Sequence, residues 1–545
     1  MTDRTRIFFP PLLFLALTVI HTWPIASSPA RLSLNHNADA QLCEWTLSWI
    51  AHTLPAHPSS LFDGNIFAPE PHTLTYTDPM LVPALVAAPV RWAGGSPVLA
   101  FNLAMLAGLT LTAWATWWGA RRWTGSDSAA LVAGALAAYN SHLLTRLPHI
   151  VAAYAWTIPV SLVLVDRLLD EFRRRDLILF GVVVTATAVT SPYWLAQLAI
   201  VAGIGVAIGA WRRQWRAALS IAAAAMAGLA AASPILLPYA RFAATGVSRP
   251  LSSVEQFSAT LSGYLSSVSH LHAGWTRVFY RDDVNVWFAG VTAIVLAGAG
   301  LVSLLRRADT RRRGLMLIVV AAAGIVLSLG PATMIYRWLY EWLLPLRGLR
   351  AAARFGYLYL VVVAYAAAIG TAALQRRARG PRAAGLIAAL VLIAVTIEAW
   401  SGPVKTVPFD GVPAIYQQIA NAPDPVRLAE LPFYPAEGIF MNGEYVLNAT
   451  AHWRPLMNGY SGYIPDSYRD ASNRLWYFPE SRAMDALLDT GATHVMVHLE
   501  KFTPQEIADI DRVLRGSTRL TLLASDTMGH RLYKVLGSEV LVPGF

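Results

Sequence analysis

The chain alternates long apolar stretches with short polar connections. An apolar stretch needs roughly 17–25 residues to cross a bilayer as a helix. The first candidate is "IFFPPLLFLALTVIHTWPIA" at 7–26, and later ones lie at 98–119, 128–145, 151–169, 176–192, 194–211, 216–238, 285–304, 313–330, 354–373 and 383–401. The pattern predicts a polytopic α-helical membrane protein with about eleven spans.

Every second connection between the apolar stretches is rich in arginine. The stretches "ARRW", "DEFRRRD", "WRRQWR", "RRADTRRR" and "QRRARGPR" fall on every second one. Arginine-rich connections stay in the cytoplasm, and the opening "MTDRTR" belongs on the same side. We therefore expect a bacterial inner (plasma) membrane protein with a cytoplasmic N-terminus and a periplasmic C-terminus.

Two features near the start are open to a second interpretation. The basic start, the apolar core and "IASSPA" also fit a cleaved signal peptide. We expect an uncleaved anchor that keeps residues 1–27, because most of the remaining chain is also membrane-embedded. The segment 79–93 would break the alternation if it crossed, so it is expected to lie on the outer surface as an interfacial helix.

The pattern changes after residue 402. "RLAELPFY", "HVMVHLE", "LTLLASD" and "HRLYKVL" have the character of short strands. "TPQEIADIDRVLRGS" predicts a helix with Thr503 as N-cap and Glu506 closing a capping box, and "SRAMDALLDTG" predicts another that ends at Gly491. The chain is thus expected to divide into a membrane domain, 1–402, whose outer loop 28–97 carries two surface helices, and a soluble periplasmic α/β domain, 403–545.

Composition agrees with this division. Hydrophobic residues make up 55% of the chain and charged residues only 14%. The net charge of +10 is almost entirely arginine, and its short clusters between apolar runs indicate membrane topology and not nucleic-acid binding. Cys43 is the only cysteine, which excludes an intramolecular disulfide and a CxxC metal site.

Three carboxylates stand out on the first outer loop. Asp39 follows the first span directly, and Leu42, Trp45 and Trp49 at helical spacing predict a helix, 38–54, lying flat at the interface. Asp39 and Glu44 would lie off that lipid-facing stripe. Without further information, Asp39 also fits a solvated carboxylate stabilised by a helix N-terminus. Asp78 precedes Pro79, which suits an N-cap costing about 1 kcal/mol to remove.

Several local stretches resemble one bacterial branch of the GT-C superfamily of integral-membrane glycosyltransferases. They are "TYTDPMLVPALVAAPV", "VLAFNLAMLAG", "YNSHLLTRLPHI", "LRGLRAAARFGYLYL" and "HWRPLMNGYSGY". The resemblance implies a sugar donor carried on a polyprenyl phosphate and a catalytic Asp early in the first outer loop. Asp39 matches that Asp by position, with Asp78 and Glu44 as second carboxylates. "NADAQ" has no adjacent second acid, which leaves a divalent metal open. The acceptor would be a glycan, a lipid or a protein.

Two polar clusters could bind the donor phosphate. Arg347, Arg350 and Arg354 have spacings of three and four, so they would share one side of a helix, with Arg350 in the middle. Lipid headgroups would suit the same arginines. The second cluster, at the outer end of a span, comprises His142, Arg146 and His149. Polar residues at a helix mouth usually line a cavity, although a single histidine is more often structural.

The most distinctive soluble stretch is "HWRPLMNGYSGYIPDSYR". Its aromatic faces and hydrogen-bond donors are those that a sugar-binding surface uses. The acceptor-binding or sugar-binding candidates are His452, Trp453, Arg454, Tyr460 and Tyr463. The alternative is that this loop only packs one domain onto the other.

Three functions fit this organisation: a lipid-linked-sugar glycosyltransferase, a transporter or flippase, and a non-enzymatic scaffold with an outer binding domain. Transporters tend to have paired halves and charges in mid-helix, whereas here most charges lie at helix ends and the halves differ. The glycosyltransferase is favoured. The enzyme is supported if Asp39, the 142–149 cluster and the 347–354 arginines line one outer-facing cavity in the structure.

Overall fold

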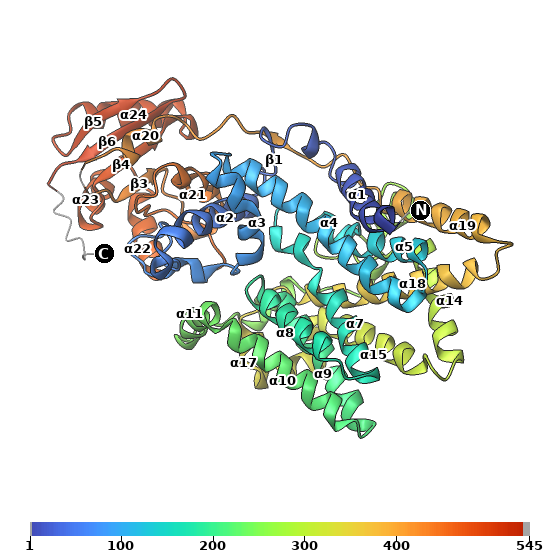
Figure 1. Ribbon diagram of the computed structural model, residues 1–545. Helices are drawn as coiled ribbons and strands as arrows, with labels where there is room; N and C mark the ends of the chain where they lie inside the picture. The colour runs from blue at the N-terminus through green and yellow to red at the C-terminus, as the bar shows by residue number, and fades with distance from the viewer. Residues whose placement is uncertain (1–2, 424, 538–545) are drawn as a thin grey trace. The chain divides into compact units, whose positions relative to one another are not determined.

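The computed structural model describes residues 3–423 and 425–537 (Figure 1). The chain forms two compact units. The helical unit comprises Met1–Ser28, Asp78–Val86 and Asn102–Lys405, and the mixed unit comprises Pro29–Thr77, Ala87–Phe101 and Thr406–Phe545.

The helical unit contains helices that range from four residues to 28 residues. Of these, α3 (Leu81–Trp92) ends in the other unit and α4 (Pro97–Thr124) begins there. The others are α1 (Asp3–His21), α5 (Asp127–Ala138), α6 (Ser141–Leu144), α7 (Thr157–Asp170), α8 (Arg174–Ala188), α9 (Pro192–Trp211), α10 (Trp215–Ala231), α11 (Ser233–Ala244), α12 (Leu251–Gln256), α13 (Ala273–Thr276), α14 (Val291–Arg306), α15 (Arg311–Ser328), α16 (Met334–Trp342), α17 (Leu344–Arg347), α18 (Tyr357–Gln375) and α19 (Pro381–Ala399).

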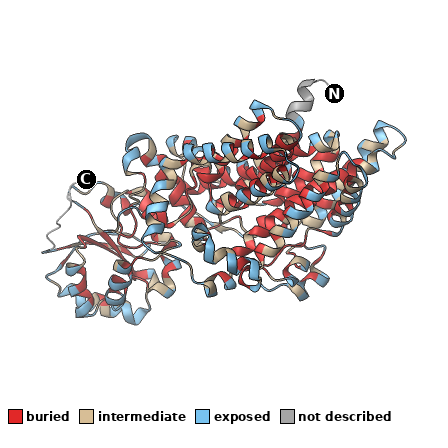
Figure 2. Cartoon of the chain, turned by 90° about the horizontal axis from the view of Figure 1, so that it is seen from below, coloured by how far each residue is buried: buried red, intermediate tan, exposed pale blue. Residues whose placement is uncertain are grey.

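Helix α19 has an exposed apolar face. More than half of the surface of four of its apolar side chains is exposed, at a spacing that follows one helix face: Leu386, Leu390, Ile393 and Ile397. A continuous apolar stripe of this length is costly in water and stable in lipid. Figure 2 shows exposed positions on the outer sides of several helices. With its other apolar helices, the chain is a multi-pass membrane protein.

Fewer helices qualify as spans than the hydropathy pattern predicts. Among the described residues, 5 helices are long and apolar enough, or 6 if α10 and α11, bent by 82°, form one broken span. The run at 128–145 is interrupted because the Asn140 side chain accepts a hydrogen bond from the Leu143 N–H and starts α6. The run at 216–238 breaks at Ala232, just before Pro234.

Three of the arginine-rich connections lie together. Asp166, in the last part of α7, is fully buried between Arg312 (2.6 Å) and Arg313 (2.8 Å) at the start of α15. Asp170, the first residue of "DEFRRRD", also pairs with Arg312 (2.8 Å). The Arg313 guanidinium lies over Trp123, in the "ARRW" stretch. Three connections that the charge pattern assigns to one side of the membrane therefore meet at one end of the helical unit.

The mixed unit contains short strands and short helices. They are β1 (Leu32–Ser33), α2 (Ala38–Ala56), β2 (Val407–Pro408), α20 (Tyr416–Ala420), β3 (Leu428–Leu431), α21 (Gly443–Asn448), α22 (Asp466–Leu475), α23 (Ser481–Asp489), β4 (His494–His498), α24 (Pro504–Arg515), β5 (Leu520–Ser525) and β6 (His530–Val535).

A four-stranded sheet in the order β3-β4-β6-β5 forms the centre of this unit. β3 runs parallel to β4, while β4 and β5 pair antiparallel with β6. The four strands expected from the sequence are confirmed. The capping box of Thr503 and Glu506 at the start of α24 is also confirmed, as is the end of α23 before Gly491, whose φ is +69°.

The outer loop belongs largely with the C-terminal part of the chain, whereas the sequence suggested a boundary near residue 402. β1 pairs with β2, and the Asn65 amide donates to the carbonyls of Ala449 and Arg454. α2 packs closely on α21, where a Cβ on Gly443 would clash with Gln41 Oε1. These contacts join residues almost 400 positions apart, which local patterns do not reveal.

The apolar stripe of α2 is buried within the mixed unit and not available to lipid. Leu42, Trp45 and Trp49 are all less than a tenth exposed. The Trp45 indole donates to Asn65 Oδ1 (2.9 Å), and the Trp49 indole donates to the Leu61 carbonyl (2.8 Å). The prediction that these three residues lie against the bilayer is wrong, because the segment that comes after α2 covers them.

Candidate functional site

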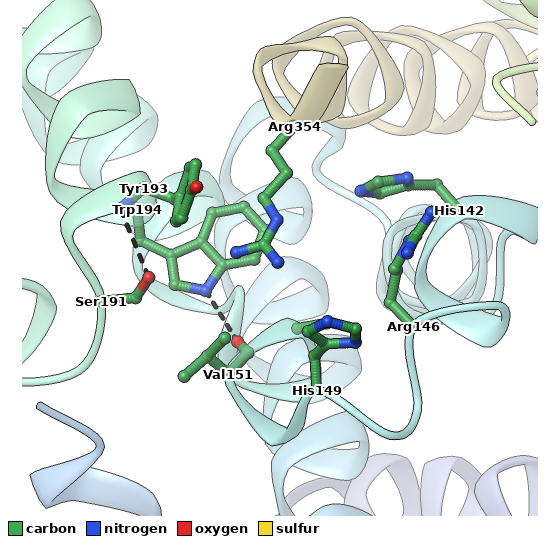
Figure 3. Close-up of a pocket in the computed structure, with 9 residues that line it drawn as sticks. His142, Arg146, His149, Val151, Ser191, Tyr193, Trp194 and Arg354 are labelled. Atoms are coloured by element: carbon green, nitrogen blue, oxygen red, sulfur yellow. Dashed lines mark hydrogen bonds between the residues drawn. The ribbon is translucent and has the colours of Figure 1, made fainter. Parts of the chain in front are cut away.

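The helical unit contains a pocket formed by charged and aromatic side chains (Figure 3). Its walls are His142, Arg146, His149, Val151, Ala152, Ser191, Tyr193, Trp194 and Arg354. It therefore unites the whole 142–149 cluster with one member of the arginine set.

Tight turns bring the three cluster residues to one place. α6 has only four residues, after which the N–H of Arg146 bonds to the Leu143 carbonyl and the N–H of His149 bonds to the Arg146 carbonyl. Two successive turns thus replace a continuous helix. Their effect is that His142, Arg146 and His149 face the same cavity (Figure 3).

Arg354 reaches the pocket from the opposite wall and lies on an aromatic ring. Its guanidinium is 4.1 Å from the centroid of Tyr193. The Tyr193 hydroxyl accepts hydrogen bonds from the backbone N–H groups of Arg350 and Ala351, both at 3.2 Å. The ring is therefore held at both its face and its tip, and it supports Arg354 through a cation–π contact.

Asp78 joins this site through Ser191. The Ser191 hydroxyl donates to Asp78 Oδ2 (2.8 Å). Burial raises the pKa of the Asp78 carboxyl, while the Arg354 charge, the Ser191 hydrogen bond and the His149 charge act to lower that pKa. The capping role expected for Asp78 is wrong: α3 begins only at Leu81, and the N–H groups of Met80 and Leu81 bond to the carbonyls of Thr190 and Val189.

His142 has a different character from the arginines. Its ring is buried and stacks on Trp287, with centroids 3.9 Å apart. Burial lowers the pKa of His142 well below its ordinary value, and the neighbouring charges of Arg146 and Arg354 lower it further. The imidazole is therefore neutral at physiological pH, so it can offer a hydrogen bond to a ligand but no charge.

The pocket is narrow as the side chains stand. Its free volume of about 10 Å³ corresponds to roughly one water molecule. A phosphate group is larger, so its entry requires the long side chains of Arg146 or Arg354 to swing aside. Both are only partly buried, which allows such movement.

The other two arginines of the expected set do not line this pocket. α17 ends at Arg347, whose guanidinium donates to the carbonyls of Tyr340 and Glu341. Arg350 is exposed, and its guanidinium lies 4.4 Å from the ring centroid of Phe257. The three arginines do not share a helix face, because the helix stops at Gly348 and only a short 3₁₀ turn comes after it.

Asp39 lies in the mixed unit, in the first turn of α2. The N-cap residue Asn37 accepts a hydrogen bond from the Asp39 N–H (2.9 Å), and the Tyr460 hydroxyl donates to Asp39 Oδ1 (2.9 Å). Tyr463 packs edge-on against Tyr76, with ring centroids 5.0 Å apart. Asp39, Tyr460 and Tyr463 are all partly exposed, so a carboxylate and two aromatic side chains remain accessible to a ligand.

The remaining candidates of the soluble stretch are engaged in packing. His452 is buried beside Tyr416, and its Nδ1 accepts a hydrogen bond from the N–H of Arg454. The Trp453 ring stacks on His52 at 4.2 Å. The Arg454 guanidinium donates to the main-chain carbonyls of Ala420 and Ala422, at the end of α20. These three residues therefore pack within the mixed unit, whereas Tyr460 and Tyr463 keep accessible surface.

Glu44 is fully buried and does not face a ligand. With the Asn35 amide nitrogen turned towards it, that nitrogen donates to both carboxylate oxygens, at 2.9 and 3.1 Å. Burial raises the pKa of Glu44 well above its ordinary value of 4.5, although the Asn35 hydrogen bond acts to lower it. Glu44 is therefore a structural group and a poor candidate for the second catalytic carboxylate.

The raised pKa of Glu44 predicts a stability that depends on pH. The folded chain binds this proton more tightly than the unfolded chain, so the Glu44 contribution to stability falls as pH rises above about 4.5. Glu44→Gln removes the ionisation. We expect a higher apparent Tm than wild type at pH 7–8, with the difference vanishing in acid. Thermal melts of purified protein from pH 5 to 8 measure this, with the exposed Glu437→Gln as control. A lower Tm for Glu44→Gln at every pH would contradict the assignment.

Three pocket residues have little to distinguish them in the sequence. Ser191, Tyr193 and Trp194 belong to "TSPYWL" at the start of α9, where Ser191 is the N-cap and Pro192 the first helical residue. A Ser-Pro start with two aromatics after it is an ordinary helix beginning. Its one usable signal is that it opens a long apolar helix.

Two sequence comparisons bear on this geometry. The chain matches the family described as "Domain of unknown function (DUF6311)" over residues 34–397. No protein of curated function matches the sequence.

Among solved structures, the mycobacterial arabinofuranosyltransferase AftD is similar, with a TM-score of 0.64 and 16% identity. That similarity covers 98% of this chain and 40% of AftD, so the chain spans less than half the length of that protein. Weaker similarity extends to the Archaeoglobus fulgidus oligosaccharyltransferase (TM-score 0.49, 14% identity, 97% and 73% covered) and to ArnT from Cupriavidus metallidurans (0.38, 14%, 97% and 98%). The fold is therefore similar to that of AftD, and the chain belongs to the DUF6311 family.

Proposed function

We propose that this protein is a membrane glycosyltransferase that moves a sugar from a polyprenyl-phosphate donor to an acceptor at the outer face of the membrane. The observation that carries the proposal is the pocket of Arg146, Arg354, His142 and His149 inside a membrane-embedded unit with the GT-C fold. The similar AftD structure is that of an arabinofuranosyltransferase, which supports the reaction class.

The pocket suits the phosphate of such a donor. Two guanidinium groups supply charge and bidentate hydrogen bonds, which match phosphate oxygens. Asp78 is the carboxylate that interacts with Arg354 and His149. Burial disfavours the ionised form of Asp78, so the site favours an anionic ligand over a cation.

The charges also suit the reaction. As the bond between the anomeric carbon and the phosphate oxygen breaks, the electron pair stays on the departing polyprenyl phosphate, which gains a negative charge. Arginine side chains already in place stabilise that charge more in the transition state than in the ground state. Arg354, supported by the ring of Tyr193, is the better positioned of the two.

Asp39 is the proposed general base. The acceptor hydroxyl would form the new bond to the anomeric carbon and pass its proton to the Asp39 carboxylate. The Tyr460 hydroxyl holds one oxygen of that carboxylate and so fixes its direction. Tyr460 and Tyr463 would supply aromatic and hydroxyl contacts to a sugar.

The reaction class and the orientation are tested together. Purified protein should transfer sugar from at least one member of a panel of polyprenyl-phosphate sugars. In sealed membranes, transfer to a water-soluble acceptor added outside should occur in right-side-out vesicles and not in inverted ones. No transfer from any donor would overturn the function. Transfer confined to inverted vesicles would keep the function and reverse the orientation.

A further inference from the structure

A cluster of ligand-type side chains lies at one end of the sheet in the mixed unit, apart from the residues assigned above. His498 is the last residue of β4 and His530 is the first of β6, and the antiparallel register pairs them directly. Their rings meet edge to face, with centroids 4.8 Å apart. Glu500 comes two residues after His498 and turns its carboxylate towards both rings.

The atoms of this cluster have the spacing of metal ligands. Glu500 Oε1 is 3.3 Å from His498 Nδ1 and 3.6 Å from His530 Nε2, and the three ligand atoms all lie within 4.8 Å of one another. Around a zinc ion with bonds of about 2.0–2.1 Å, two ligands at the tetrahedral angle are separated by roughly 3.3 Å. Two of the three separations already approach that value.

Each imidazole is oriented from behind by a carboxylate. His498 Nε2 lies 2.7 Å from Glu430 Oε2, and His530 Nδ1 lies 2.7 Å from Asp526 Oδ2. When a ring is neutral, this carboxylate accepts its N–H, and the other nitrogen turns its lone pair towards Glu500, as a metal ligand must. Metal-binding histidines almost always show this arrangement, in which the distal N–H donates to a fixed acceptor.

Burial and charge distinguish the cluster from a surface ion pair. Both imidazoles are almost fully buried, and His498 Nδ1 has no hydrogen-bond partner of good geometry among the described residues. Three carboxylates, those of Glu430, Glu500 and Asp526, surround two imidazoles. The nearby Lys501 forms its close ion pair with Glu444 (2.7 Å). The cluster therefore has an excess of negative charge that a divalent cation would balance.

We propose that His498, Glu500 and His530 bind a zinc ion. Two imidazole nitrogens and one carboxylate oxygen suit zinc better than magnesium or calcium, which prefer oxygen ligands. Glu500 is about one-third exposed, with 38% of its side chain accessible, so the ion enters from the solvent side. The ion ties β4 to β6, while Glu430 on β3 and Asp526 after β5 extend the clamp across the sheet.

The metal content of the full chain tests the site. Protein purified without a polyhistidine tag should carry about one zinc per chain by elemental analysis, or take up one zinc when titrated after chelator treatment. Glu500→Gln is nearly isosteric and partly exposed, so it preserves the fold, and it should reduce the zinc to less than about a tenth of that value. Asp526→Asn, which changes only an orienting group, should weaken zinc affinity by roughly 10–100-fold.

A matched control separates ligand loss from general damage. Glu444→Gln removes a carboxylate of similar exposure from a neighbouring ion pair, and it should retain the zinc of wild type. His530→Gln gives a second ligand variant should the first misfold. The proposal is overturned if wild type neither contains nor takes up zinc, or if Glu500→Gln and His530→Gln bind zinc as wild type does. The cluster would then be an ionic clamp of protonated histidines.

Discussion

Replacing Asp39 by Asn should lower the turnover of sugar transfer by roughly 10²–10⁴-fold, the usual cost of losing a general base. Asn keeps the shape of the side chain and can still accept the Tyr460 hydrogen bond, but it cannot take up a proton at neutral pH. The affinity for the donor should change little. Steady-state kinetics that separate kcat from the donor KM measure both effects.

Asp78→Asn is the matched comparison, since it also exchanges one carboxylate for an amide. The amide oxygen can still accept from Ser191, so the start of α9 should hold. The variant loses the charge that faces Arg354 and His149, and so its main effect should be on the donor KM. If Asp78→Asn abolishes turnover while Asp39→Asn retains it, the base is Asp78. If both variants retain turnover, neither carboxylate is the base.

Asp78 is a stronger candidate in the structure than its sequence context indicated. "TDPM" resembles a helix start, since Asp before Pro is a common beginning. The Ser191 hydroxyl that holds Asp78 comes from a residue 113 positions away. Such a contact cannot be predicted from the residues next to Asp78 in the sequence. Asp39 and Tyr460 were each recognisable as candidates, but the hydrogen bond between them crosses 421 positions.

Features determined by neighbouring residues were predictable. The capping box of α24 and the strands β3 to β6 depend on local alternation and on residues three apart, and all of them form. Among the described residues, fewer helices than expected are long and apolar enough to span a membrane, also for a physical reason. Hydropathy averages over an apolar run, whereas a single Asn140 cap or Pro234 ends a helix inside it. The pocket owes its turns at 142–149 to one such interruption.

A helix end also explains why the arginine set was only partly right. Spacings of three and four place side chains on one face only while the helix continues. It stops at Gly348, so Arg347 folds back on its own carbonyls, Arg350 lies over Phe257, and only Arg354 reaches the pocket. Arg350, the middle residue of the set, thus becomes the natural control for Arg354.

Arg354→Gln should raise the KM for the polyprenyl-phosphate donor by roughly 10–150-fold. This factor corresponds to about 1.5–3 kcal/mol for hydrogen bonds to a charged group. Gln keeps some length and polarity but loses the charge and the fork that match phosphate oxygens. Arg354→Lys, which restores the charge without the fork, should recover part of the loss. Arg350→Gln should leave the donor KM near wild type, because its guanidinium lies outside the pocket.

The partner Asp78 makes the test sharper. Arg354 and Asp78 interact electrostatically, so their effects on the donor KM should not add, and a double-mutant cycle measures the coupling. The Arg354 charge is the strongest influence that lowers the pKa of Asp78, so Arg354→Gln should raise that pKa further. A donor KM that responds to Arg350→Gln and not to Arg354→Gln would move the phosphate site to the exposed arginine. A donor KM that responds to neither would remove the pocket from the donor site altogether.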